Sequence, residues 1–323
     1  QTVPAATDFN RIEGNTQYLK DEIDSHCVTM GSENDIYVAK IGSLFEFTPL
    51  EANYGYIYAM ATDDEFVYVG GLSQTVKKLN KSDLSQVAES VNYGGAIEAI
   101  ATDDEFVYVG VWGIQTVRIL RKSDLSQVAE SANYSGIYAI AVDDNYVYVG
   151  GSDRTVRKLR KSDLSQVAES TNYGGTIEAI ATDDEFVYVG GQTTRTVRKL
   201  RKSDLSQVAE STNYGGNIYT IATDDEFVYV GGLSQTVKKL NKSDLSQVAE
   251  SADYGGVIRA IATDDEFVYV GGLTTRTVKK LRKIDLSRAA ESSSYGGAIY
   301  AIATDDEFVY VGGITQTVRV IEN

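Results

Sequence analysis

Short runs of apolar and β-branched residues alternate with clusters of Gly, Asp, Asn and Ser along most of the chain. One stretch carries four such runs, at Ile97–Thr102, Phe106–Gly110, Thr116–Leu120 and Leu125–Ser131. The runs are rich in Val, Ile, Tyr and Thr and are too short for ordinary helices, so each predicts a β-strand. The chain has only two prolines, so almost nothing interrupts a β-ladder.

The same four-run unit recurs throughout the chain. The motif Asp-Asp-Glu-Phe-Val-Tyr-Val-Gly, or its variant Asp-Asp-Asn-Tyr-Val-Tyr-Val-Gly, recurs every 40 or 41 residues, at Asp63, Asp103, Asp143, Asp183, Asp224, Asp264 and Asp305. Four strands in a period of this length are typical of a β-propeller blade. Small residues such as Ala99 and Ala101 suit the crowded centre of a propeller, so the first strand of each unit is expected to be innermost. The repeats therefore predict an all-β, seven-bladed propeller with four-stranded blades.

The seventh copy needs an outer strand from elsewhere, because the chain ends soon after its third predicted strand, Thr317–Ile321. Residues Asp35–Leu44 align with Thr75–Leu84 at an offset of 40. This alignment predicts Leu44–Thr48 as the missing outer strand, which would fasten the N-terminal part of the chain to the last blade.

The same region also allows a ring of eight blades. Cys27–Gly31, Ile36–Lys40 and Leu44–Thr48 can be read as three strands of a degenerate eighth blade. The seven-bladed ring is preferred. Residues 28–323 are expected to form the propeller, closed by the N-terminal strand, and residues 1–27 a separate N-terminal segment.

A short helix is predicted within residues 1–27. Thr7 or Asp8 can cap its start, and apolar or small residues then follow at steps of three and four, at Phe9, Ile12, Thr16, Leu19 and Ile23. A helix this short is only marginally stable in isolation. Its apolar stripe, called the seam here, must therefore pack against another surface. It docks either on the chain's own propeller or on other copies of the chain, in which case Phe9, Ile12, Leu19 and Ile23 carry the self-association.

Two parts of the chain resemble known families. Residues 6–23, Ala-Thr-Asp-Phe-Asn-Arg-Ile-Glu-Gly-Asn-Thr-Gln-Tyr-Leu-Lys-Asp-Glu-Ile, resemble a segment of tail-fibre and receptor-binding proteins from bacteriophages and prophages of Gram-positive bacteria. The repeats over 57–323 resemble symmetric propellers of the broad WD40, YVTN and quinoprotein-like group, without the Gly-His and Trp-Asp signatures of WD40 blades. The first resemblance implies a virion-tail or extracellular protein, a possible homotrimer, with other tail proteins as partners.

Differences between the copies concentrate at two places. One is the loop between the second and third strands, and the other is a position early in the first strand. In an up-and-down blade, this loop and the entry to the first strand lie on the same face, so both sets are expected to converge around the channel mouth. The candidate ligand-binding residues are Tyr58, Glu98, Trp112, Tyr138, Arg154, Glu178, Arg195, Tyr219, Arg259, Arg276 and Tyr300.

The aromatic candidates have two interpretations. The four tyrosines and Trp112 offer flat apolar faces with polar tips, which suit sugar rings or the side chains of a partner. They can equally serve in packing between blades and in anchoring a loop. Several weak, equivalent sites would gain avidity on a multivalent surface, which favours a bacterial surface glycan as the ligand.

Charge and hydropathy exclude two classes of partner. The formal net charge of −16 repels a phosphate backbone, so nucleic acid is not an expected partner. No apolar run approaches the roughly 18 residues that a membrane-spanning helix needs, so membrane insertion is not expected.

The residue inventory argues against catalysis. His26 is the only histidine and Cys27 the only cysteine, and neighbouring residues in a strand point to opposite faces, so they do not form a dyad. Glu98 and Glu178 could act as an acid–base pair, but packing or ligand contact is favoured because they stand two copies apart. The Asp-Asp-Glu turns suit Ca²⁺ by ligand type but lack the spacing of a calcium loop, so solvated turn chemistry is preferred. No catalytic residue, metal or cofactor is predicted.

These observations predict a non-enzymatic phage or prophage tail protein that recognises a bacterial surface glycan or surface protein. The alternative is a structural or scaffolding propeller that binds a protein partner through the same face.

Overall fold

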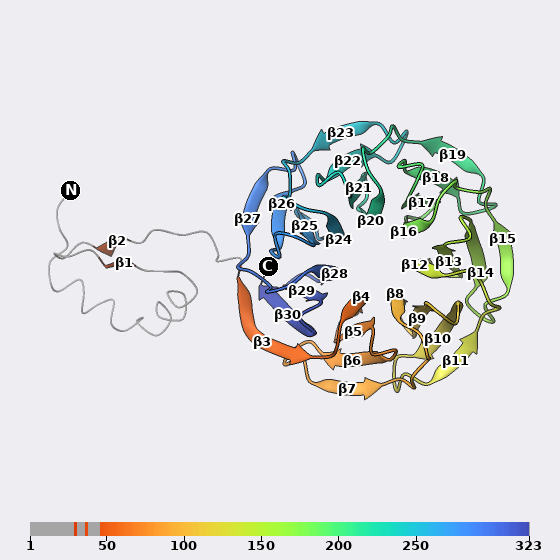
Figure 1. Cartoon of the computed structure of the whole chain (residues 1–323), viewed down its shortest axis with the longest axis horizontal. Helices are drawn as coiled ribbons and strands as arrows, with labels where there is room; N and C mark the ends of the chain where they lie inside the picture. Colours follow the sequence, from red (N-terminus) through yellow and green to blue (C-terminus); the bar gives the residue numbers. More distant parts are fainter. Residues whose placement is uncertain (1–28, 31–35, 38–45, 323) are drawn as a thin grey trace. The chain divides into compact units, whose positions relative to one another are not determined.

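The computed structural model describes residues 29–30, 36–37 and 46–322, and the chain divides into two units, Gln1–Glu46 and Phe47–Asn323 (Figure 1). In the first unit, β1 (Thr29–Met30) and β2 (Ile36–Tyr37) pair antiparallel. The predicted helix with its seam lies outside the described residues, as do His26 and Cys27. The described residues contain no helix long and apolar enough to cross a membrane.

The second unit consists of seven four-stranded sheets. The innermost strands are β4 (Ile57–Thr62), β8 (Ile97–Thr102), β12 (Ile137–Val142), β16 (Ile177–Thr182), β20 (Ile218–Thr223), β24 (Ile258–Thr263) and β28 (Ile299–Thr304). The second strands are β5 (Phe66–Gly71), β9 (Phe106–Val111), β13 (Tyr146–Gly151), β17 (Phe186–Gly191), β21 (Phe227–Gly232), β25 (Phe267–Gly272) and β29 (Phe308–Gly313). The third strands are β6 (Val76–Asn80), β10 (Thr116–Arg121), β14 (Val156–Arg160), β18 (Arg198–Arg201), β22 (Lys238–Asn241), β26 (Lys279–Arg282) and β30 (Thr317–Glu322). The outer strands are β7 (Gln86–Glu89), β11 (Gln127–Glu130), β15 (Gln166–Glu169), β19 (Gln207–Glu210), β23 (Gln247–Glu250), β27 (Arg288–Glu291) and, in the last sheet, β3 (Phe47–Asn53).

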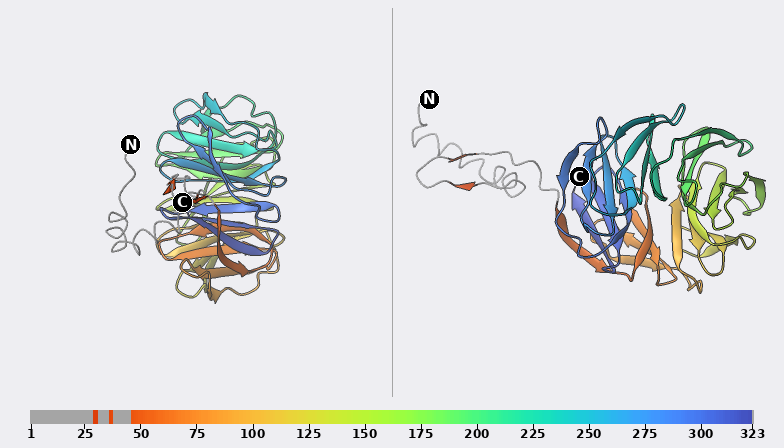
Figure 2. Two further views of the ribbon diagram at one scale, coloured as in Figure 1. Left: turned by 90° about the vertical axis from the view of Figure 1, so that its left-hand side faces the viewer. Right: turned by 45° about the horizontal axis from the view of Figure 1, so that its top comes forward.

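The sheets are the blades of a seven-bladed propeller, numbered here from blade 1 (β4–β7) to blade 7 (β28–β30 with β3). The first strand of every repeat surrounds the central channel, as its small residues predict (Figure 1). The eight-bladed alternative is wrong, because the segment assigned to its third strand overlaps β3, the outer strand of blade 7. The propeller has two faces (Figure 2). We call one the variable face, formed by the loops between second and third strands and by the entries to the innermost strands.

Blade 7 closes with a strand from the N-terminal side of the repeats. β3 pairs antiparallel with β30, with Glu51 opposite Arg319. This is the register of the other blades, where Glu130 lies opposite Arg118. The predicted strand, Leu44–Thr48, is therefore wrong in its bounds, because the repeated pairing of an outer-strand glutamate with a lysine or arginine of the third strand, and not the offset of 40, decides which residues pair.

Neighbouring blades pack through a glycine near the end of each second strand. An ideal Cβ on Gly110 would lie 2.7 Å from Cγ2 of Ile137 in the next blade. At the junction between blades 7 and 1, a Cβ on Gly312 would lie 2.7 Å from Cγ2 of Ile57. Because real Cβ atoms do not approach so closely, only glycine lets the second strand lie against the isoleucine of the next innermost strand.

On the face opposite the variable face, a Tyr–Asp–Lys joint links each of six blades to its neighbour. Asp63 Oδ1 accepts hydrogen bonds from the backbone N–H groups of Glu65 (3.1 Å) and Phe66 (2.8 Å). Its Oδ2 accepts a hydrogen bond from the Tyr68 hydroxyl (2.8 Å) and pairs with Lys122 Nζ of blade 2 (2.8 Å). One carboxylate therefore holds its own turn, its own second strand and the next blade.

Six of these ion pairs occur among the described residues: Lys122–Asp63, Lys161–Asp103, Lys202–Asp143, Lys242–Asp183, Lys283–Asp224 and Lys81–Asp305. The last joins blade 1 to blade 7. Burial opposes ionisation of Asp63, but the hydrogen bonds from Lys122, Tyr68 and the turn amides outweigh burial and lower the pKa of this carboxyl. In these six turns the first aspartate is thus a half-buried connector and not the solvated turn residue that was expected.

A second set of lysines strengthens the same junctions from the third strands. Lys78 Nζ lies 3.6 Å from the centroid of the Phe66 ring and donates to the carbonyl oxygen of Lys122 in the next blade (2.8 Å). Burial lowers the pKa of this ammonium group. Lys158, Lys199 and Lys239 repeat the arrangement.

Truncation on either side of β3 tests the closure of the ring. Residues 47–323 are expected to unfold cooperatively, whereas residues 54–323 lack the strand paired with β30 and should melt at least several degrees lower, with exposed strand edges that promote aggregation. Thermal unfolding followed by circular dichroism measures both. Equal melting temperatures would contradict this role of β3.

Acidification tests the Tyr–Asp–Lys joints. The folded-state pKa of the joint aspartates lies below the unfolded value of about 3.9, so the joints stabilise the fold above that pH. This contribution disappears as the pH falls through the lowered pKa. We expect Lys161→Met to cost about 1 kcal/mol near neutral pH. The variant should also lose less unfolding free energy than the parent between about pH 5 and pH 2, as measured by urea denaturation. Parallel pH dependences would contradict the ion pair's contribution.

Candidate functional site

The site is built from one irregularity repeated in every innermost strand. In blade 2, Ile97 pairs with Val111 and Ala99 with Gly110, so Glu98 between them has no partner on β9. Such a β-bulge can re-aim a side chain. The same shift occurs in all seven blades.

The bulged residues are the variable first-strand positions, and together they line a hollow of about 240 Å³ at the channel mouth. We call them the mouth ring, which in blade order is Tyr58, Glu98, Tyr138, Glu178, Tyr219, Arg259 and Tyr300. All seven side chains are partly exposed. The differences between the repeat copies identified these positions but did not reveal the bulge at each of them.

The acidic side of the mouth ring comes from blades 2 and 4. Burial, and then the charge of Glu178, raise the pKa of Glu98, while the charge of Arg259 opposes the rise. Burial also raises the pKa of Glu178, against the hydrogen bond from Gln192 and the charge of Arg259. Gln192 Nε2 donates to Glu178 Oε1 (2.6 Å) and comes from the variable loop of blade 4.

The basic side of the mouth ring is a single arginine held by aromatic rings. The Arg259 guanidinium carbon lies 4.1 Å from the centroid of the Tyr219 ring and 5.7 Å from that of Tyr300. Tyr300 in turn contacts Tyr58 edge-to-face, with the centroids 5.4 Å apart. Arg259 Nε is buried and has no hydrogen-bond partner among the described residues.

Trp112 connects a variable loop to the mouth ring. Its Nε1 donates a hydrogen bond to the Tyr138 hydroxyl of the next blade (3.2 Å), and 49% of the residue is exposed. Together with the contact between Gln192 and Glu178, this bond shows that the two variable sets meet at the mouth. No local pattern signals the Trp112–Tyr138 pair, because its members lie in different blades.

The three loop arginines are placed differently. Arg154, Arg195 and Arg276 are exposed, none of them lines the hollow, and each adopts a positive φ, of 69°, 57° and 58°. Their carbonyl oxygens accept the backbone N–H of Tyr173, Tyr214 and Tyr295. Their backbone closes the loops, while their side chains extend from the variable face.

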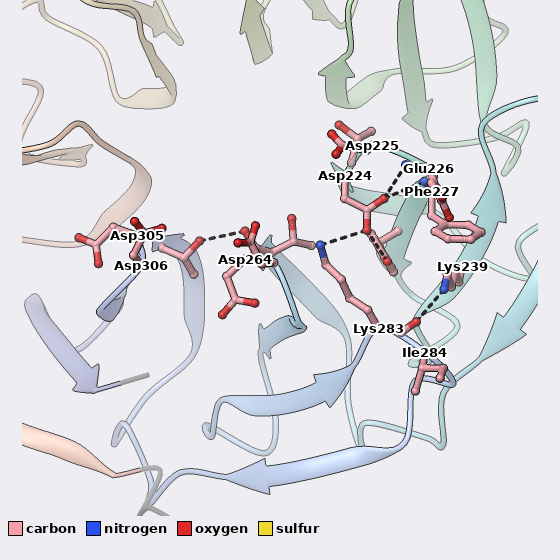
Figure 3. Close-up of a pocket in the computed structure, with 15 residues that line it drawn as sticks. Asp224, Asp225, Glu226, Phe227, Lys239, Asp264, Lys283, Ile284, Asp305 and Asp306 are labelled. Carbon is pink, nitrogen blue, oxygen red and sulfur yellow. Dashed lines mark hydrogen bonds and ion pairs between the residues drawn. The ribbon is translucent and has the colours of Figure 1, made fainter.

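The opposite face has grooves built from the constant repeats. One of these grooves, of about 620 Å³, lies where the turns of blades 5, 6 and 7 meet, and is lined by Asp224 and Lys283 of a Tyr–Asp–Lys joint and by Lys239 (Figure 3). Figure 3 shows Lys283 reaching Asp224. No group of three or more His, Cys, Asp or Glu side chains suited to a metal ion occurs in the described part of the chain.

Comparison with known proteins supports the fold and goes no further. No protein-family model matches the sequence, and no curated protein matches it. Among solved structures, the chain is similar to the crystal structure of the computationally designed Ika8 protein, with a TM-score of 0.69 and 15% identity over 87% of this chain and 100% of that one. Likeness at this identity shows a β-propeller with repeated blades and carries no function to this chain.

Titration of Glu98 and Glu178 tests whether the three charged residues of the mouth ring act on one another. Arg259 holds down the pKa of both Glu98 and Glu178, so Arg259→Gln should raise both. Carboxyl carbon resonances followed by NMR across the acid range measure the two values, with Arg195→Gln as the control outside the hollow. Unchanged values in Arg259→Gln would contradict the convergence of the three charges.

Proposed function

We propose that this chain is a non-enzymatic binding protein whose variable face recognises a glycan on a bacterial surface. One observation carries the proposal: the positions that differ between otherwise near-identical repeats include the seven that line one hollow. Residues needed only for the fold have no reason to vary together at one place. A shared binding site accounts for this pattern.

The chemistry of the mouth suits a polar ligand with flat faces. Four tyrosines and Trp112 supply aromatic surface, and their hydroxyl and N–H groups supply hydrogen bonds. Glu98, Glu178 and Arg259 add charge-assisted bonding. The constant joints on the opposite face hold the blades, so the mouth residues are fixed before the ligand arrives, which reduces the entropy lost on binding.

The N-terminal resemblance supports a more specific proposal. Residues 1–27 would mount the propeller on other tail proteins of a phage or prophage, with Phe9, Ile12, Leu19 and Ile23 joining three copies. The protein would then work at the virion tail or outside the cell. Several mouths on one particle would convert weak single contacts into strong attachment to a repeating polysaccharide.

A scaffold that binds a protein partner is the second candidate. Its supporting observation is a row of exposed valines on the outer strands: Val87, Val128, Val167, Val208 and Val248. Regularly spaced apolar side chains on the rim could contact a partner protein.

Binding to bacterial surfaces tests the proposal. Fluorescently labelled protein is titrated onto Gram-positive cells and their purified wall polysaccharides. Trp112→Ala should weaken binding about tenfold, equivalent to about 1.4 kcal/mol, because it removes an aromatic face at the mouth. Ile284→Ser is the control, since Ile284 is 81% exposed on the opposite face and most other repeats have serine there.

Binding that Trp112→Ala leaves intact would contradict a site at the mouth. Failure to bind any surface, together with capture of a single protein partner that is lost when Val167 and Val208 become serine, would favour the scaffold.

A further inference from the structure

The mouth ring has unsatisfied charges of both signs. Within the described part of the chain, Glu98 forms no hydrogen bond and no ion pair, and the Arg259 guanidinium lies beside two tyrosine rings and also forms neither. Among the described residues, Arg259 acts on Glu98 and Glu178 through its charge and forms an ion pair with neither, although all three line the same hollow. Partly buried charges that face each other across a hollow without touching leave room for a group that contacts both.

Each side of the hollow suits one sign of charge. Tyr138 stands in ring order between Glu98 and Glu178, and Trp112 is hydrogen-bonded to it. Aromatic faces beside carboxylates bind a cationic nitrogen well, including one that carries methyl groups and cannot donate hydrogen bonds.

Arg259 is prepared for an anion. The Tyr219 and Tyr300 rings hold its guanidinium group, and its buried Nε–H lacks an acceptor. No hydrogen bond or ion pair to its terminal N–H groups occurs in the described part of the chain, and a phosphate or carboxylate oxygen in the hollow would supply an acceptor for them.

Simple ligands fit the mouth less well. An anion alone faces two glutamates, a cation alone faces Arg259, and an uncharged sugar pairs with neither sign. We propose that the channel mouth binds a zwitterionic group, with its cationic nitrogen toward Glu98 and Glu178 and its anionic oxygens toward Arg259. This inference rests on the proposed function, because the group would be a substituent of the surface glycan.

Phosphocholine is a suitable probe, and the protein carries its own reporter. Trp112 is the only tryptophan of the chain, so its fluorescence reports on the mouth. The full chain is titrated with phosphocholine, choline and inorganic phosphate, and calorimetry provides a second reading. We expect saturable binding of phosphocholine, with choline and phosphate each at least tenfold weaker. Equal affinity for phosphocholine and for either fragment would overturn the proposal.

Variants of the mouth ring test which side chain contacts the anionic part of phosphocholine and which contacts the cationic part. Arg259→Gln and Glu98→Gln should each weaken phosphocholine binding at least tenfold, and Arg259→Gln should reduce the preference for phosphocholine over choline. Glu98→Tyr and Arg259→Tyr are second variants that remove the same charges and are expected to fold, because tyrosine already occupies the equivalent position in four blades. Arg160→Gln, at the exposed end of β14 and outside the hollow, should bind as the parent does. Parental affinity in Arg259→Gln would overturn the proposal.

The outcome separates this inference from the proposed function. A protein that binds wall polysaccharide through Trp112 but does not bind phosphocholine would overturn the zwitterion inference and leave the glycan proposal standing. A protein that binds phosphocholine at the mouth but no bacterial surface would support the zwitterion site and overturn the glycan proposal.

Discussion

Closure between blades 7 and 1 is the constraint on which the rest of the structure depends. Each blade buries its faces only against two neighbours, so an open ring would expose core on both sides of the gap. Three interactions close it: β3 pairs with β30, Gly312 admits Ile57, and Lys81 pairs with Asp305. The mouth ring crosses the same junction, where Tyr58 meets Tyr300, so the proposed binding site exists only in the closed ring.

The two faces of the propeller divide stability from recognition. The Tyr–Asp–Lys joints repeat on one face and hold neighbouring blades at a fixed spacing, and the buried lysines of the third strands add a second connection. On the variable face, the contacts of Trp112 with Tyr138 and of Gln192 with Glu178 each occur once and are not repeated from blade to blade. A repeat that is secured at one end can change side chains at the other with little risk to the fold.

The sequence was sufficient to predict the strands, the blade number and the innermost strand, because these follow from local composition and from a period. It was insufficient where the answer depends on a distant partner. The bounds of β3 follow from Glu51 facing Arg319, which an alignment offset cannot show. Asp63 links two blades only through Lys122, which lies in the next blade. The sequence of the turn alone therefore suggested only solvated aspartates. The bulge at Glu98 is visible only once β8 and β9 are paired.

The central claim is that ligand recognition occurs at the mouth ring and the variable loops around it. Hydrogen–deuterium exchange of the full chain, with and without bound wall polysaccharide, tests it most directly. The account predicts added protection at the starts of the innermost strands and in the variable loops, strongest around Trp112 and Arg259. Protection confined to the Asp-turn face or to the outer strands would contradict it.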